Sequence, residues 1–86
     1  MTYQLVFSKR AAKELADLPR DIVSRLDKEI QSLAEKPRPA DCKKLKGKFA
    51  DGYRVRVGDY RILYLIDDQQ HRINIYRVGH RRDIYE

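Results

Sequence analysis

Three arginines share one face of a predicted β-hairpin, and their side chains are the strongest candidates for chemistry: Arg54, Arg56 and Arg61. Residues 53–57 alternate in polarity, and a longer apolar strand follows at residues 60–66. The two-residue loop between them, Gly58-Asp59, favours a type I′ or II′ turn and fixes the register of the two strands. In that register Arg56 lies directly opposite Arg61. Because like charges that face each other across strands destabilise a sheet, this pair must be compensated by solvent, by nearby carboxylates or by an anionic ligand.

Further basic residues flank the hairpin on both sides: Lys44, Lys46 and Lys48 before it, and Arg81 and Arg82 after it. Guanidinium groups fixed on strands form a preorganised anion site, because their paired N–H donors match phosphate oxygens. We therefore interpret the arginine face as a phosphate-binding surface, with the three lysines and Arg82 as substrate-binding residues. The alternative is a solvated face whose arginines pair with Asp51, Asp59 or Asp83.

Two titratable residues near the C-terminus could take part in the same chemistry. Positive charge beside Tyr85 would favour its phenolate form, and its ring could also stack on an unpaired base. His80 is a candidate acid or base, since histidine is the side chain suited to proton transfer near neutral pH. The alternative roles are an aromatic residue at the edge of the core for Tyr85 and a solvated ring for His80. No spacing of cysteines, histidines or carboxylates indicates a metal or cofactor site, and we expect no cofactor.

The net charge of +6 is concentrated in one segment. Residues 43–66 hold seven Lys or Arg against two Asp, a net charge of +5, whereas residues 1–42 hold eight basic against seven acidic side chains. An acidic partner such as nucleic acid is therefore expected. A chain of 86 residues with 42% hydrophobic content suits one domain, residues 1–86, with one modest core. Because no apolar run approaches the roughly 20 residues of a membrane span, we expect a cytoplasmic protein with no membrane partner.

The rest of the pattern predicts the elements that position the arginine face. Residues 3–7 favour a strand, and residues 9–18 and 22–33 show helical spacing of apolar side chains. Pro19 between these two segments predicts a pair of antiparallel helices. An antiparallel meander of three strands follows, at residues 53–57, 60–66 and 73–78. The expected fold class is α+β: an N-terminal strand, a helical hairpin and the three-stranded meander, with the helices packed on one compact sheet.

Three segments give the chain a specific likeness to a known family: Lys44-Leu45-Lys46-Gly47, Gly52-Tyr53-Arg54-Val55-Arg56-Val57-Gly58-Asp59-Tyr60-Arg61 and Val78-Gly79-His80-Arg81-Arg82-Asp83-Ile84-Tyr85. In order and spacing they resemble the RelE/ParE superfamily of toxins from type II toxin–antitoxin systems, and the likeness covers almost the whole chain. Within the superfamily the chain is most similar to the RelE branch, whose members are mRNA interferases that cleave mRNA in the ribosomal A site. The resemblance implies the RelE-like fold and this activity.

The family reaction implied by the resemblance is a metal-independent endoribonuclease reaction. The ribose 2′-OH attacks the adjacent phosphate, leaving a 2′,3′-cyclic phosphate and a free 5′-OH end. The catalytic positions of the RelE branch fall here on Arg54, Arg56, Arg61, Arg81 and Tyr85. His80 is a further candidate for proton transfer, by analogy with relatives that use a C-terminal histidine. Guanidinium groups suit the negatively charged pentavalent transition state. Arg54, Arg56 or Lys46 could assist deprotonation of the 2′-OH only if strongly perturbed, and an arginine is a poor general base.

The resemblance also implies partners for the chain. These are a cognate antitoxin encoded by the adjacent gene, the ribosome with its mRNA, and operator DNA reached only through the antitoxin. Two alternative functions remain open: a ParE-like toxin that inhibits DNA gyrase without cutting RNA, and a non-catalytic RNA-binding module. Substituting Arg81 or Tyr85 by alanine discriminates between them, because an enzyme should lose cleavage and toxicity while it keeps antitoxin binding.

Overall fold

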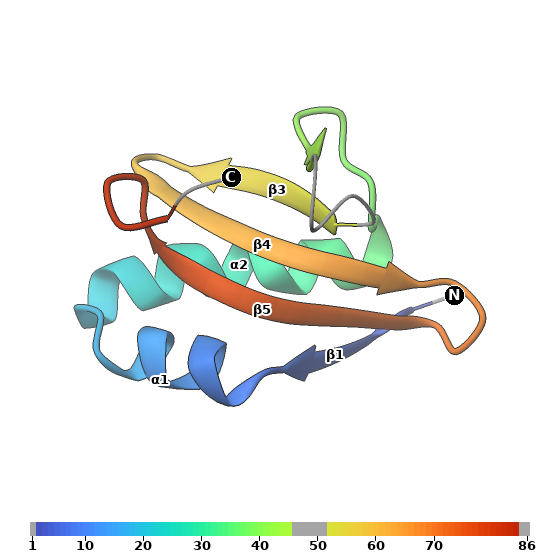
Figure 1. The fold of residues 1–86 in the computed structure, drawn as a ribbon, viewed down its shortest axis with the longest axis horizontal. Coiled ribbons are helices and arrows are strands. Elements are labelled where there is room, and N and C mark those ends of the chain that lie inside the picture. The colour runs from blue at the N-terminus through green and yellow to red at the C-terminus, as the bar shows by residue number, and fades with distance from the viewer. Residues whose placement is uncertain (1, 46–51, 85–86) are drawn as a thin grey trace.

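The computed structural model describes residues 2–45 and 52–84, and within them the chain forms one mixed sheet that carries two helices (Figure 1). The elements in chain order are β1 (Gln4–Phe7), α1 (Lys9–Ala16), α2 (Arg20–Glu35), β2 (Lys43–Lys44), β3 (Gly52–Val57), β4 (Tyr60–Asp67) and β5 (Arg72–His80). The strand order across the sheet is β1-β5-β4-β3-β2. This arrangement confirms the α+β class and the predicted β3–β4–β5 meander.

The two helices begin and end where local signals place them. Ser8 is the N-cap of α1, since its Oγ accepts a hydrogen bond from the backbone N–H of Ala11 at 3.0 Å. The helix ends at Ala16, two residues before the position that the apolar spacing predicts. Pro19 then precedes α2, where its fixed backbone angle suits the start of a helix and its missing N–H leaves no donor unsatisfied.

The β3–β4 hairpin has the register predicted from its turn. Arg56 pairs with Arg61, and Val57 pairs with Tyr60 next to the turn. Gly58 has a φ of 60°, whereas Asp59 has no positive φ. A type I′ turn requires positive φ at both central residues and a type II′ turn only at the first, so the type II′ alternative fits.

Parallel pairing with β5 places β1 at one edge of the sheet, with Gln4 opposite Arg72 and Phe7 opposite Ile75. Beyond β1, helix α1 takes over that edge. The Glu14 carboxylate accepts a hydrogen bond from the backbone N–H of Val78 at 3.0 Å and forms an ion pair with Arg77 at 2.8 Å. The carboxylate thus satisfies a donor of β5 that β1 is too short to reach.

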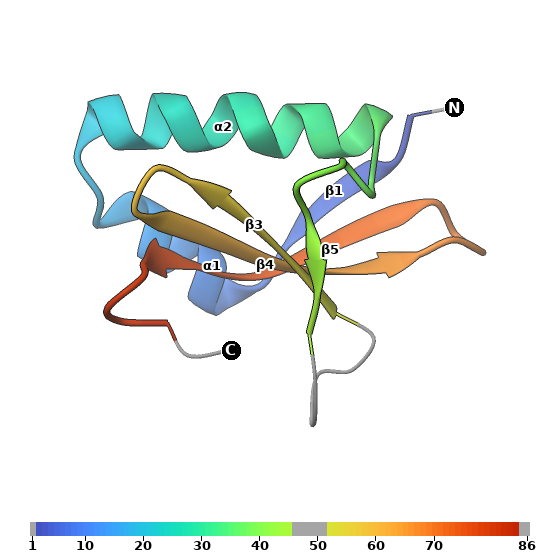
Figure 2. The ribbon, with the colours of Figure 1, turned by 90° about the horizontal axis from the view of Figure 1, so that it is seen from above.

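The main core lies between α2 and one face of the sheet, as Figure 2 shows from above. Its fully buried members from α2 and the three central strands are Leu26, Ile30, Leu33, Val55, Ile62, Tyr64, Ile73, Ile75 and Val78. Val55, Ile62 and Tyr64 of the β3–β4 hairpin therefore face this core. The C-terminal segment lies on the opposite side of the sheet from α2 (Figure 2), where Leu45, Leu63 and Ile84 form a second, smaller apolar cluster.

A polar network ties the N-terminal strand to the loops at the far end of the sheet. Asp68 accepts hydrogen bonds from the Arg38 guanidinium at 2.9 Å and from the Tyr3 hydroxyl at 2.6 Å. The hydrogen bond from Arg38, followed by that from Tyr3, holds the pKa of the Asp68 carboxyl below its usual value. The same contact with Asp68 raises the pKa of the Tyr3 phenol.

In the described part of the chain, neither helix is long and apolar enough to cross a membrane.

Candidate anion-binding site

Three arginines surround one hollow beside the β3–β4 turn. The hollow offers about 100 Å³ of space to water and is lined by Arg56, Gly58, Asp59, Arg61 and Arg81. Arg56 is exposed and Arg61 half-buried, so the cross-strand pair presents its guanidinium groups at different depths. Among the described residues that line it, three cations face one carboxylate, a formal net charge of +2. This hollow is suited to a phosphate group.

The turn itself holds Arg81 in place. The backbone N–H of Arg81 donates to the carbonyl oxygen of Asp59 at 2.8 Å, and the Arg81 Nε lies 3.9 Å from the Asp59 carboxylate. Both side chains are about two-thirds exposed, so this ion pair is screened by water and contributes little to stability. The backbone hydrogen bond to Asp59, rather than the ion pair, therefore fixes the position of the Arg81 backbone.

The segment after Arg81 is anchored by a buried isoleucine. Ile84 is 1% exposed and packs in the second apolar cluster with Leu63. A Cβ on Gly79 would lie only 3.1 Å from the Ile84 Cδ1, so a glycine at that position leaves room for Ile84 to lie close to β5. The C-terminal segment is thereby held against the arginine face of the sheet.

Arg54 lies on the same face but deeper than the other arginines. It is 4% exposed and sits between Leu63 of β4 and Lys43 of β2 in the ladder. At this burial its guanidinium adds positive potential to the face without being open to direct contact from an incoming phosphate. The structure thus brings Arg54 to the site's face but not into the hollow.

The short strand β2 decides which lysine joins the arginine face. Lys43 pairs with Arg54, whereas Lys44 pairs with Tyr53, and directly opposed side chains lie on the same face of a sheet. Lys43 therefore extends the basic face, and Lys44 belongs to the other side. Sequence reasoning missed Lys43, because only the register of this two-residue strand distinguishes the two lysines.

His80 and Arg82 are not brought together with the three arginines. His80 pairs with Tyr60, which packs on the core side of the sheet. Both His80 and Arg82 line a separate hollow of about 270 Å³ whose acidic members are Glu14, Asp17 and Asp83. Arg82 therefore lies apart from the proposed phosphate contacts, and the position of His80 is not suited to proton transfer in the arginine hollow.

The remaining candidates lie outside the described residues: Lys46, Lys48 and Tyr85. Among residues 2–45 and 52–84, no group of three or more histidine, cysteine or carboxylate side chains is placed to hold a metal ion. On the arginine face, the phenol next to the apolar cluster is Tyr76, and burial raises its pKa. The β4–β5 ladder shifts by one residue beside Tyr76, since Leu63 pairs with Arg77 and Tyr64 with Ile75, and forms a β-bulge there.

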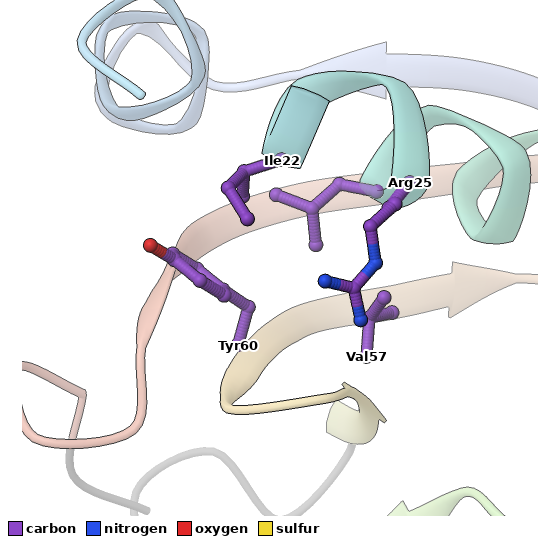
Figure 3. Close-up of a pocket in the computed structure, with 5 residues that line it drawn as sticks. Ile22, Arg25, Val57 and Tyr60 are labelled. Carbon is purple, nitrogen blue, oxygen red and sulfur yellow. The ribbon is translucent and has the colours of Figure 1, made fainter. Parts of the chain in front are cut away.

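Helix α2 contacts the turn that carries the site. Arg25 reaches from α2 toward the end of β3, beside Val57 and Tyr60 (Figure 3). A Cβ on Gly58 would lie 2.9 Å from the Arg25 Nη2. Glycine thus meets two demands here, the positive φ of the turn and the close approach of Arg25.

Comparison with known proteins places the chain in a family. Residues 5–85 match the model of the ParE toxin of the type II toxin–antitoxin system parDE. The toxin RelG of Mycobacterium tuberculosis is 35% identical, over 99% of this chain and 98% of that protein. The mRNA interferase toxin RelE of Escherichia coli is 31% identical, over 94% of this chain and 85% of that protein. In the crystal structure of the toxin–antitoxin complex RelBE2 from Mycobacterium tuberculosis, a chain 31% identical matches with a TM-score of 0.83, covering 93% of this chain and 99% of its own length. Since both the family model and these relatives span nearly the whole sequence, the chain belongs to the RelE/ParE family of toxins from type II toxin–antitoxin systems.

Proposed function

We propose that this toxin is an endoribonuclease that cleaves mRNA by attack of a ribose 2′-OH on the adjacent phosphate, leaving a 2′,3′-cyclic phosphate and a 5′-OH end. The observation that carries the proposal is the convergence of Arg56, Arg61 and Arg81 on one hollow. The name of the E. coli relative, an mRNA interferase toxin, supports the same reaction for this chain. The substrate is mRNA and the site of action is the ribosomal A site, so the toxin inhibits translation.

In this mechanism the three arginines bind the scissile phosphate and stabilise the transition state. The pentavalent phosphorane carries more negative charge than the phosphodiester, so fixed guanidinium donors bind it more strongly than they bind the substrate. Arg54 and Lys43 act at longer range, by raising the positive potential of the face along which the RNA backbone lies.

Proton transfer needs groups other than the arginines, whose guanidinium groups do not release a proton in proteins. Lys46 and Tyr85 are the residues we propose for it, Lys46 as an aid to deprotonation of the 2′-OH and Tyr85 in stacking on the base and in proton transfer. The Tyr85 assignment rests on the resemblance of the sequence to the RelE branch, and the Lys46 assignment on its amine beside the basic hairpin in the sequence. Alanine at Tyr85 should abolish most cleavage without weakening antitoxin binding.

The size of the hollow supports a role for the ribosome. A surface hollow of about 100 Å³ lined by five of the described residues suits contact with a phosphate group and does not enclose a nucleotide. The toxin therefore needs another body to hold the RNA in line for attack, and the ribosome, by positioning mRNA, supplies that orientation. Free RNA should be cleaved much more slowly than mRNA on translating ribosomes.

We further propose that a cognate antitoxin encoded by the adjacent gene binds this chain and masks the arginine face, and that operator DNA is reached only through that antitoxin. The support is the similarity to a toxin solved in a toxin–antitoxin complex and the +2 charge of the hollow, which an acidic segment would neutralise. Co-purification with the product of the adjacent reading frame tests this; failure to form a complex would overturn it.

A second candidate function is inhibition of DNA gyrase without RNA cleavage, and it is favoured by the ParE description of the matched family model. A third, a non-catalytic RNA-binding module, would use the same basic face without the reaction. A supercoiling assay with purified gyrase, run beside the cleavage assay, separates these functions. Gyrase inhibition with intact mRNA would replace the proposed function by the second, and RNA binding without either effect by the third.

The proposed function is tested by comparing three single-arginine variants in cleavage on programmed ribosomes. Arg81→Ala should lower the single-turnover rate about 100- to 1,000-fold, the usual loss for one donor to a charged transition state. Arg72→Ala removes the same charge at the opposite end of β5 and serves as the matched control, with a rate near that of the wild type. Arg82→Ala should lose less activity than Arg81→Ala, since Arg82 lines the other hollow. Equal losses in all three variants would show a general charge effect and contradict the site.

A further inference from the structure

His80 ends β5 on the side of the sheet that carries the helices, away from the arginine hollow. Its ring meets the Tyr60 ring edge-on, with centroids 5.3 Å apart and an interplanar angle of 74°. The charged groups around the hollow that it lines are Glu14 from α1, Asp17 directly after α1, and Arg82 and Asp83 from the C-terminal segment. None of these is one of the three arginines that surround the proposed phosphate site.

The ring nitrogen closest to the backbone is already engaged. His80 Nδ1 accepts a hydrogen bond from the backbone N–H of Arg82 at 3.2 Å, and the His80 carbonyl oxygen accepts from the N–H of Asp83 at 2.9 Å. A side-chain acceptor bound to the N–H two residues further on is the arrangement that Asn and Asp side chains make in turns. With Nδ1 as acceptor, the neutral ring carries its proton on Nε2.

Arg81 lies between the two ends of this turn. The Arg81 N–H donates to the Asp59 carbonyl oxygen in the β3–β4 turn. The N–H of the next residue, Arg82, donates to His80 Nδ1, so hydrogen bonds hold the backbone at Arg81 and directly after it. Loss of the His80 acceptor would free the Arg82 N–H and widen the range of directions in which Arg81 leaves the strand. The hollow would then lose the fixed position of one of its three guanidinium groups.

We propose that His80 is a positioning residue for Arg81, acting through Nδ1 as a hydrogen-bond acceptor, and that it is neither acid nor base in the reaction. The effect on cleavage rests on the proposed function, whereas the hydrogen bond itself does not. His80 thus has a structural role, which a residue without an imidazole can fill, in place of the proton-transfer role expected from the sequence.

Two variants separate the acceptor from the ring. His80→Asn keeps an acceptor that reaches the Arg82 N–H but has nothing in place of Nε2, so it cannot transfer a proton there. His80→Phe keeps an aromatic ring against Tyr60 but has no acceptor. We expect His80→Asn to cleave mRNA on ribosomes within about twofold of the wild-type rate. His80→Phe should lose roughly three- to tenfold in the single-turnover rate at saturating toxin, as expected for one lost hydrogen bond, with little change in half-saturation.

Nuclear magnetic resonance of ¹⁵N-labelled toxin gives a readout that does not depend on activity. The neutral His80 ring of the wild type should show the Nε2–H tautomer, and the Arg82 amide resonance should move in His80→Phe but stay close to its wild-type position in His80→Asn. If the wild-type toxin cleaves no RNA, the proposed function is contradicted, but the resonance measurement still tests the hydrogen bond between His80 and Arg82. An Nδ1–H tautomer, or a His80→Asn variant as slow as His80→Phe, would overturn the positioning role.

Discussion

Replacing Gly58 by alanine perturbs the turn on which the whole arginine site depends. Gly58 has a φ of 60°, in the left-handed region that costs an L-residue about 1–2 kcal/mol. The added Cβ would also lie 2.9 Å from the Arg25 Nη2, with the next atom of that side chain 3.8 Å away. Because Nη2 is the end of a long, exposed side chain, Arg25 can swing aside at little cost, so backbone strain should dominate.

The magnitude follows from the size of the chain. An entropy of unfolding of about 2.1 cal/mol/K per residue gives roughly 180 cal/mol/K for this domain, so 1 kcal/mol corresponds to about 6 °C in Tm. Gly58→Ala should therefore lower the free energy of unfolding by about 1–2 kcal/mol and Tm by about 6–11 °C. Cleavage should fall as well, because the Asp59 carbonyl that holds Arg81 belongs to the same turn.

The assay is urea unfolding of four proteins: wild type, Gly58→Ala, Arg25→Ala and the double variant. If backbone strain dominates, Gly58→Ala costs the same in both backgrounds to within about 0.5 kcal/mol. Gln69→Ala, an exposed position in the β4–β5 turn, is a control expected within about 0.5 kcal/mol of wild type. Backbone strain would not be the cause if Gly58→Ala were as stable as wild type, or if its loss of stability disappeared in the Arg25→Ala background.

The other predictions concern the C-terminal anchor, the polar network and the cap of α1. Ile84→Ala should cost about 2–4 kcal/mol of stability, because Ile84 is fully buried in the second apolar cluster; denaturant unfolding measures this, and a cost below 1 kcal/mol would show that the segment is not anchored there. Asp68→Ala should lower Tm slightly at pH 7, because the folded-state pKa of Asp68 lies below its unfolded value. That stabilisation is present above a pH of about 4, the pKa of the unfolded carboxyl, and is lost as the pH falls through the folded-state pKa. A difference in Tm that persists undiminished at pH 2 would contradict the assignment. Ser8→Ala should cost about 1 kcal/mol through loss of the N-cap bond to Ala11, whereas a neutral change in thermal unfolding would argue against the cap.

The parts of the fold set by local chemistry could be predicted from the sequence. A two-residue turn at Gly58 leaves one register for β3 and β4, and that register placed Arg56 opposite Arg61. The start of α1 has a local cause of the same kind, because the Ser8 side chain caps the helix through the nearby Ala11 N–H. These signals depend on neighbours within a few residues, which is why a single sequence contains them.

The parts set by long-range contacts could not be predicted in the same way. No local pattern indicates that β1 pairs parallel with β5, a contact between residues nearly 70 positions apart. The side of the sheet taken by His80 follows from β5 extending to residue 80, beyond residue 78, where the predicted strand ends. The burial of Arg54 follows from its central place in the ladder, beneath a face on which Leu45 and Ile84 also pack. Each of these depends on how distant segments meet.

The central claim, that the arginine hollow cleaves mRNA, is tested most directly by mapping new RNA ends after translating ribosomes meet the purified toxin. Attack by the 2′-OH should give cuts within coding sequence that carry a 5′-OH on one side and a 2′,3′-cyclic phosphate on the other. These cuts should be absent with Arg81→Ala and far weaker on free RNA. Intact mRNA, or ends that carry a 5′-phosphate, would contradict the central claim.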